Sequence, residues 1–215
     1  MDTCIYERSC YYMTMQKGAQ TRALILDQAV AHASEVGLEG LSIGSLAGRL
    51  KLSKSGLFAH FGSKEELQIA TLRRAQELFE NKVFRPALST PRGTPRLLEL
   101  FRRWLQWLDA SGQPGGCVIL SAVAEFDDRP GAVRDTLLAG QKQLRGAIIK
   151  AVRLAIEAGD LAAETDAWQL AFELFGVVLA AHHDRHLFED RRAMERGMQA
   201  VESLLAAHGA QPAKA

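Results

Sequence analysis

The sequence predicts an all-α protein of about nine helices in two units, a small N-terminal three-helix unit and a larger C-terminal helical unit. Apolar residues recur at three- and four-residue spacing through most of the 215 residues, which is the pattern of helices with one buried face. Two of these helices are short and adjacent, between residues 41 and 64. No stretch alternates apolar and polar residues in the way that a half-buried strand does.

The first predicted helix covers about residues 20–36, and Gly37 and Gly40 are predicted to end it. Residues 1–18 show no helical period. They are predicted to be disordered, or to precede the true start of translation, because unanchored termini are usually loose. The buried stripe of the first helix consists of Ile25, Leu26, Ala29, Val30 and Ala33.

Residues 41–64 are predicted to form two short helices joined by a tight turn. Ser42 and Ser53 are placed to cap them, because a serine hydroxyl accepts an unpaired N–H of the first turn. Gly62 suits the end of the second helix, where a positive φ is needed. Ser63 and Glu66 form a capping-box sequence that starts the next helix.

The two short helices are predicted to turn their apolar residues inward, namely Ile43, Leu46, Ala47 and Leu50 on the first and Leu57 and Phe61 on the second. The second helix then presents small, polar or basic residues to solvent, namely Lys54, Ser55, Gly56, Ala59 and His60. With helix 20–36 they complete a three-helix unit of the helix-turn-helix kind, which enters the DNA major groove. An ordinary helical hairpin has the same periodicity, so periodicity leaves both alternatives open.

A longer set of residues decides between these alternatives. The matching segments are Thr21-Arg22, 25–29 (ILDQA), Gly37, Gly40, 41–43 (LSI), Leu46-Ala47 and 53–67 (SKSGLFAHFGSKEEL). In this order they resemble the TetR family of transcriptional regulators, closely over about residues 19–67 and in architecture beyond them. The resemblance implies a helix-turn-helix DNA-binding domain at 19–65 and a ligand-binding and dimerisation domain at 66–208. Residues 209–215 are predicted to be a disordered tail.

The formal net charge is only +1, so the distribution of charge is more informative than its sum. Residues 14–64 hold six positive and three negative side chains, which leaves a modest basic patch suited to phosphate. Lys17 would serve a flexible arm that touches DNA, if residues 1–18 form one.

Composition and motifs exclude several other classes of protein. No apolar run is long enough to span a membrane, and the N-terminus lacks the apolar region of a signal peptide. Three cysteines do not form a secreted disulfide framework, so a cytoplasmic location is expected. There is no Gly-rich phosphate loop, no HExxH and no GxSxG, so no enzyme activity and no cofactor are expected.

The C-terminal unit is predicted from the same helical spacing. A connector helix over residues 64–84 and a loop over 86–95 come first, and Thr94 is predicted to cap the helix that follows, with Pro95 in its first turn. The later helices are expected at about residues 117–125 and 132–158, from a cap at Thr165 or Asp166, and at about 190–207.

The helix after Asp166 is apolar on several faces, and such a helix must be covered on more than one side. The resemblance implies that the last two helices pair with their copies in a second subunit as a four-helix bundle. A homodimer with two-fold symmetry is therefore expected. Its partner would be a near-palindromic double-stranded DNA operator.

The resemblance implies DNA contacts for ten residues, namely Thr21, Arg22, Ser42, Ile43, Lys54, Ser55, Gly56, Phe58, His60 and Lys64. Lys54 could read guanine or hold a phosphate, and both roles remain open. Phe58 stands at a position where the family commonly has tyrosine, which removes a phosphate hydrogen bond. Gly44 and Gly56 stand where the family more often has longer polar side chains, which weakens readout there.

The resemblance also implies a pocket for a small-molecule effector inside the C-terminal domain, lined by aromatic and apolar residues. Core packing is the alternative role for each candidate. Glu125 could meet a cationic ligand or end a helix in solvent. The candidates are Phe101, Trp104, Trp107, Cys117, Glu125, Phe126, Trp168, Phe172 and Phe175.

Two further hypotheses concern reactive side chains. Cys117 begins a helix, where the helix dipole lowers a thiol pKa, so a redox or electrophile sensor is one role and a buried small hydrophobe is the other. His182 and His186 are one helical turn apart and could hold a metal, or they could be surface or interface residues. No metal is expected, because the local sequence does not complete a ligand set.

Three functions remain distinguishable: a repressor that a small molecule releases from DNA, an activator or a regulator with a protein input, and an enzyme. A C-terminal core without a cavity would favour the second. The sequence favours the first and identifies neither effector nor operator.

Overall fold

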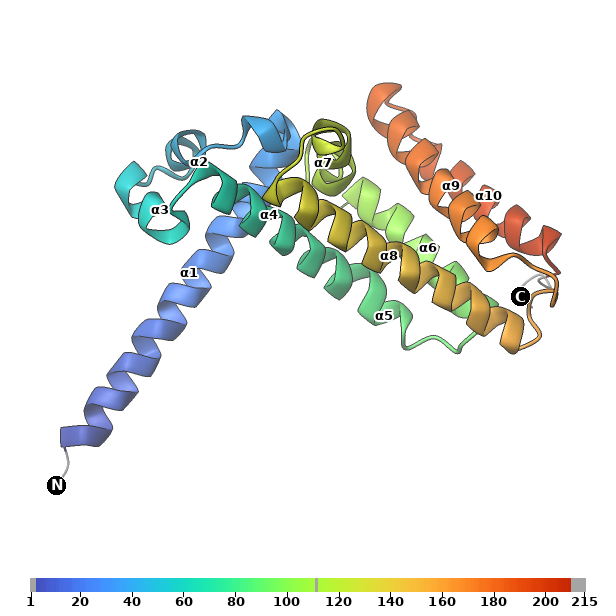
Figure 1. Cartoon of the computed structure of the whole chain (residues 1–215), viewed down its shortest axis with the longest axis horizontal. Helices are drawn as coiled ribbons and strands as arrows, with labels where there is room; N and C mark the ends of the chain where they lie inside the picture. The colour runs from blue at the N-terminus through green and yellow to red at the C-terminus, as the bar shows by residue number, and fades with distance from the viewer. Residues whose placement is uncertain (1–2, 111, 210–215) are drawn as a thin grey trace.

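The computed structural model describes residues 3–110 and 112–209, with side chains for residue 18 and from residue 20 onward, and every regular element among them is helical (Figure 1). The prediction of an all-α protein is confirmed. Because α4, η1 and α5 follow one another directly, the described residues form nine separate helical rods. The elements are α1 (Thr3–Gly40), α2 (Ile43–Leu50), α3 (Lys54–Phe61), α4 (Lys64–Phe79), the π-helical turn η1 (Glu80–Phe84), α5 (Arg85–Ala87), α6 (Thr94–Ala110), α7 (Val118–Phe126), α8 (Ala132–Glu157), α9 (Ala167–Leu187) and α10 (Ala193–Ala207).

Helix α1 begins at Thr3, well before the start that the sequence predicts near residue 20. Its N-terminal half projects away from the other helices (Figure 1). A helical segment that projects away from the other helices needs no apolar stripe, so periodicity gives no sign of it. The predicted end is confirmed at Gly37, whose φ of 78° and ψ of 159° break the helix before one more turn. Residues 1–2, and the predicted tail beyond Gly209, lie outside the described residues.

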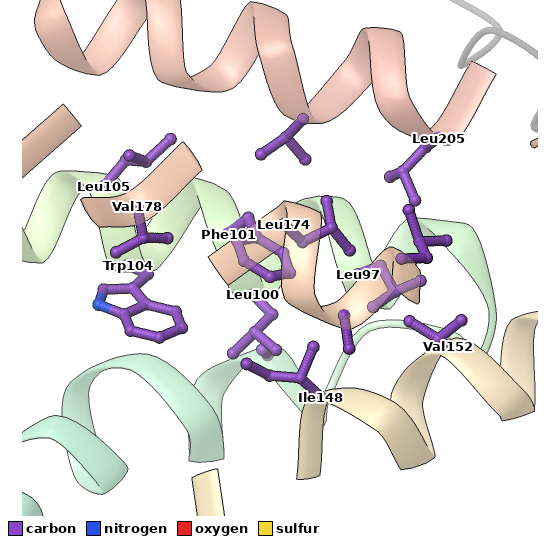
Figure 2. Packing of buried hydrophobic residues seen from close by; sticks show 14 of the residues in the cluster. Leu97, Leu100, Phe101, Trp104, Leu105, Ile148, Val152, Leu174, Val178 and Leu205 are labelled. Atoms are coloured by element: carbon purple, nitrogen blue, oxygen red, sulfur yellow. The ribbon is translucent and has the colours of Figure 1, made fainter. Parts of the chain in front are cut away.

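Two clusters of buried apolar residues hold the described helices together. The first joins α1, α2, α3 and α4 to α7 and the start of α8, with Phe126 and Leu137 among its members. The second joins α6, α8, α9 and α10 around Phe101 and Trp104, both fully buried (Figure 2). The first cluster therefore crosses the domain boundary predicted between residues 65 and 66, because α7 packs against α1.

Helix α6 starts at Thr94 as predicted, but its cap comes from elsewhere in the chain. The Thr94 hydroxyl is buried and has no hydrogen-bond partner. The Thr94 N–H instead donates to Asp160 Oδ2, 2.9 Å away in the connection between α8 and α9. The role predicted for Thr94 is wrong, since a carboxylate distant in sequence takes its N–H.

Helices α9 and α10 pack side by side at the end of the molecule remote from α2 and α3 (Figure 1). One face of α9 is buried, including Leu170, Leu174 and Val178. Another face leaves Trp168, Phe172 and Leu179 exposed. Among the described residues, no helix has the length and apolarity needed to cross a bilayer.

Candidate nucleic-acid interface and internal cavities

The reading head, by which we mean residues 42–64 with α2 and α3, is fixed by serine caps. Ser42 Oγ accepts from the Ser45 N–H at 3.0 Å, Ser53 Oγ from Gly56 at 3.1 Å and Ser63 Oγ from Glu66 at 3.0 Å. The predicted caps are thus confirmed. The capping box predicted at Ser63 has only one of its two bonds. The Ser63 N–H donates to the Phe61 carbonyl and not to the Glu66 side chain.

Two buried side chains anchor helix α3, and its other residues are exposed to solvent. Leu57 and Phe61 are 1% and 5% exposed and anchor the helix in the first cluster. Lys54, Ser55, Gly56, Phe58 and His60 are all exposed, as predicted for the face that would meet DNA. A helix held in this way can enter a groove without losing its packing on the protein.

The start of α3 lies against the start of α2. A Cβ built on Gly44 would be 3.5 Å from the Lys54 Cε, which is an ordinary contact distance. The aliphatic part of the Lys54 side chain therefore lies next to Gly44. At Gly56 a Cβ would come within 3.0 Å of the Ser53 hydroxyl that caps the helix. A Cβ would therefore fit at Gly44, whereas at Gly56 it would crowd the capping hydroxyl.

Three other predicted contacts border this face. The Arg22 guanidinium lies over the Phe61 ring, 5.1 Å from its centre, which holds α1 beside the end of α3. Thr21 precedes it on the exposed side of α1. Ile43 is half-buried and packs on the first cluster, so most of its side chain is turned toward the core.

Two cations near the reading-head surface are paired with acids at the end of α1. Arg49 makes two bonds of 2.8 Å to Glu35, and Lys64 Nζ donates to Glu39 Oε1 at 2.9 Å. The hydrogen bond from Arg49 lowers the pKa of the Glu35 carboxyl, and the bond from Lys64 does the same for Glu39. The basic patch predicted from charge counts is therefore partly neutralised.

Two of the cavities in the C-terminal domain lie along α8. One of about 290 Å³ lies between α7, α8 and α9, and Phe126 and Phe175 line it together with Arg134 and Arg145. The other, of about 260 Å³, lies between α4, η1, α5, α7 and α8. Its lining consists of Gln76, Phe79, Glu80, Phe84, Arg85, Leu88, Ile119, Gly140, Gln141, Gln143, Leu144 and Ala147. Gln141 lines both cavities.

The π-helical turn explains why sequence reasoning missed most of the second cavity. Five-residue spacing separates two side chains by well over a quarter turn on an α-helix. The wider turn of η1 instead brings the rings of Phe79 and Phe84 to 5.6 Å, and both line the cavity. Nothing in the periodicity of residues 80–84 distinguishes a π-turn from an α-helix.

The structure separates the predicted ligand residues into three groups. Phe126 and Phe175 line a cavity. Phe101 and Trp104 stack inside the second cluster with their ring centres 5.9 Å apart (Figure 2). Trp107 packs against the same cluster, so these three serve the core. Trp168 and Phe172 are exposed on α9, outside both cavities.

Glu125 takes neither of the roles that the sequence suggests. Its two carboxylate oxygens accept the Leu38 N–H at 3.1 Å and the Glu39 N–H at 2.8 Å. These N–H groups begin the last turn of α1, after Gly37, where they have no helical partner. Glu125 therefore ties the end of α7 to the last turn of α1, directly before the reading head.

Cys117 is buried, and its environment opposes the sensor hypothesis. Burial raises the pKa of the Cys117 thiol, although hydrogen bonds from the backbone of Leu120 and Ile119 act in the opposite direction. Its backbone N–H donates to His182 Nε2 at 3.2 Å. Burial lowers the pKa of His182 to about 4, so this imidazole is a neutral acceptor. Within the described part of the chain, no group of three or more His, Cys, Asp or Glu could hold a metal.

Two family models match the chain. Residues 25–71 match the family described as bacterial regulatory proteins of the tetR family, and residues 93–201 match the tetracyclin repressor-like C-terminal domain. No curated protein sequence matches the chain significantly.

Several solved structures share the fold. A TetR transcriptional regulator from Chloroflexus aurantiacus is 25% identical with a TM-score of 0.80, covering 89% of this chain and 96% of that one. A TetR-family regulator from Cytophaga hutchinsonii is 20% identical with a TM-score of 0.78, covering 91% and 98%. AibR, solved with isovaleryl coenzyme A and operator DNA, is 21% identical with a TM-score of 0.66, covering 87% and 98%.

Proposed function

The chain belongs to the TetR family of DNA-binding transcriptional regulators, and we propose that it is a repressor released from a near-palindromic operator by a small-molecule effector. The observation that carries the DNA-binding part is the exposed, polar face of α3, held on the buried Leu57 and Phe61. The proposed DNA contacts are Thr21, Arg22, Ser42, Ile43, Lys54, Ser55, Gly56, Phe58, His60 and Lys64.

A homodimer through α9 and α10 is the second part of the proposal. Trp168 and Phe172 are 60% and 65% exposed, one turn apart on a helix whose opposite face is already buried. Large aromatic side chains in an exposed stripe are typical of a surface that another subunit covers. A second copy would cover the same stripe by two-fold symmetry and place two α3 helices on one operator.

The cavities support an effector that acts on DNA binding. The 260 Å³ cavity touches α4 through Gln76 and Phe79, and the same helix begins directly after the Gly62–Ser63 link to α3. A ligand that displaces α4 would therefore move α3. In the AibR complex the protein was solved with a small molecule and operator DNA together. The presence of cavities favours this input over a protein partner.

The chemistry of the second cavity suggests a largely apolar effector with hydrogen-bonding groups. Phe79, Phe84, Leu88, Ile119 and Leu144 supply apolar surface. Its charged groups, Glu80 and Arg85, pair with each other at 3.2 Å and leave no net charge. Side-chain amides of Gln76, Gln141 and Gln143 can orient the polar groups of the ligand.

The release mechanism can be tested by adding apolar small molecules to the protein bound to fluorescently labelled operator DNA. We expect an active compound to lower the anisotropy and to raise the thermal midpoint of the free protein. Leu144→Trp, which fills the cavity, should abolish both effects while DNA binding persists. Leu138→Trp, on the rim of the other cavity, is the matched control. Release that is unchanged in Leu144→Trp would contradict the proposed location of the effector.

A further inference from the structure

Glu39, near the end of α1, lies between two cations from distant parts of the chain. Its Oε1 accepts from Lys64 Nζ at 2.9 Å, at the start of α4. Its Oε2 is 3.6 Å from Arg129 Nη1, in the turn between α7 and α8. The three side chains are 44–54% exposed, so solvent screens both pairs and neither is locked.

The backbone at Glu39 is held more firmly than its side chain. Glu125 of α7 accepts the N–H groups of Leu38 and Glu39, and the buried Gln68 amide of α4 donates to the Leu38 carbonyl at 2.7 Å. The Glu39 carboxylate is therefore attached to a fixed backbone by a side chain that is half exposed. It can shift between Lys64 and Arg129 without moving α1.

We propose that Glu39 competes with DNA phosphate for Lys64, and that Arg129 sets how strongly it competes. The inference rests on the proposed contact of Lys64 with DNA. A carboxylate and a phosphate oxygen make the same charge-assisted bond to an ammonium group, so Lys64 must leave Glu39 to bind phosphate. Arg129 then takes over the Glu39 carboxylate, which stays charged and paired.

This exchange links DNA binding to the C-terminal domain by a route that does not require α4 to move, although Lys64 is its first residue. Arg129 follows α7, which lines the first cavity through Leu120, Val123 and Phe126. When Arg129 moves away from Glu39, the carboxylate returns to Lys64 and DNA affinity falls. Because coupling is reciprocal, DNA at Lys64 in turn favours the position of the α7–α8 turn in which Arg129 reaches Glu39.

The exchange can be measured before the operator is known, because a phosphate contact does not depend on sequence. The probe is a labelled duplex of arbitrary sequence, about 30 base pairs long so that both halves of a dimer can bind. In anisotropy titrations at low salt, Glu39→Gln should bind about two- to fivefold more tightly than the wild type, the range that an exposed ion pair supports. Glu65→Gln is the matched control. It removes the same charge one residue from Lys64 and makes none of the ion pairs found among the described residues.

Arg129 provides the second half of the test. Arg129→Gln should weaken binding in the wild-type background and have no effect when Glu39 is already Gln. Arg129→Lys keeps the charge and should retain most of the affinity. The Glu39→Gln background separates the exchange from loss of the Arg129 contact with the Phe126 ring, because Arg129→Gln removes that contact there too. Glu39→Gln should also lose its effect when Lys64 is Gln.

The failure of this inference differs from the failure of the proposed function. A wild-type protein that shows no salt-dependent binding to any duplex would contradict DNA binding itself. Normal wild-type binding with Glu39→Gln indistinguishable from Glu65→Gln would overturn the exchange alone. An effect of Arg129→Gln that persists in the Glu39→Gln background would also overturn it.

Discussion

The helices of the reading head and helix α6 of the C-terminal domain are fixed at their starts by different means. In the reading head, Ser42, Ser53 and Ser63 each accept an N–H three residues further along the chain. In the C-terminal domain, the N–H of Thr94 bonds to Asp160, which is 66 residues away. Local caps can be recognised in a sequence, whereas a cap supplied by a distant loop depends on the tertiary structure that it helps to form.

The same contrast separates the two functional surfaces. The face proposed to meet DNA belongs to one short helix, and consecutive residues determine it. The cavities take their linings from five elements spread over residues 76–147 and from three over 120–179. A surface made by one element tolerates changes at its exposed positions, while a cavity between elements depends on the packing of each.

Phe61→Ala should give the largest loss of stability, and it tests whether this ring anchors α3. The ring is 5% exposed, so its removal should cost about 3–5 kcal/mol in the free energy of unfolding. DNA affinity should fall with it. Phe58→Ala is the matched control, because that ring is 57% exposed and its loss should change stability by less than about 0.5 kcal/mol. Urea denaturation compares the two variants, and equal losses would contradict the anchoring role.

Asp160→Ala tests the distant cap. The Thr94 N–H would lose its acceptor beside a threonine hydroxyl that already has no partner, which should cost about 1–3 kcal/mol. Glu164→Ala removes a nearby exposed carboxylate and should cost far less. A loss of stability no larger in Asp160→Ala than in Glu164→Ala would show that α6 does not depend on this contact.

The lowered pKa of the half-buried His182 predicts that the stability of the fold depends on pH. This imidazole accepts the N–H of Cys117, 65 residues away. The folded pKa of His182, about 4, lies below the unfolded value of 6.5, so the unfolded chain binds the proton first as pH falls. Stability should therefore be complete above about pH 6.5 and fall progressively toward pH 4. The loss between about pH 7.5 and about pH 5 should be on the order of 1 kcal/mol, because solvent screens a half-buried group.

His182→Gln is the control for this pH dependence, since it retains an acceptor and does not titrate. The variant should reduce the slope of the urea midpoint against pH. Part of the slope should remain, because burial also lowers the pKa of His32 and His186. A slope identical to that of the wild type would exclude His182 as a source.

Ser53→Ala should give the smallest effect, about 1 kcal/mol or less, because water can replace the hydroxyl at an exposed cap. Ser55→Ala, two residues on, removes a hydroxyl that donates only to Ser53 and should be nearly neutral for stability. Thermal unfolding of the two variants compares them. A larger loss in Ser55→Ala would reverse the assignment of the cap.

These differences explain what the sequence could predict. The bounds of α2, α3, α7 and α8, and the serine caps, follow from periodicity and from residues within one turn. The outward face of α3 follows from the inward positions of Leu57 and Phe61. The partners of Glu35, Glu39 and Glu125 could not be predicted, because each pairs with a group that only the tertiary structure brings close.

The ligand residues show the limit most clearly. Because Phe101, Trp104 and Phe175 are all aromatic, the sequence marks them equally as ligand candidates. In the structure Phe101 and Trp104 pack in the core, whereas Phe175 lines a cavity. The sequence contains no signal for the π-helical turn that places Phe84 at the second cavity.

The central claim is that α3 reads a specific operator, and anisotropy titration tests it most directly. The labelled DNA should be the segment immediately upstream of the gene for this chain, compared with a shuffled duplex at two salt concentrations. We predict tight binding to the native segment alone, with two chains per site. Lys54→Ala should reduce the preference for that segment, and Lys64→Ala should weaken both duplexes and lower the salt slope by about 1. Equal and steeply salt-dependent binding to both duplexes by the wild type would contradict specific readout of this segment by α3.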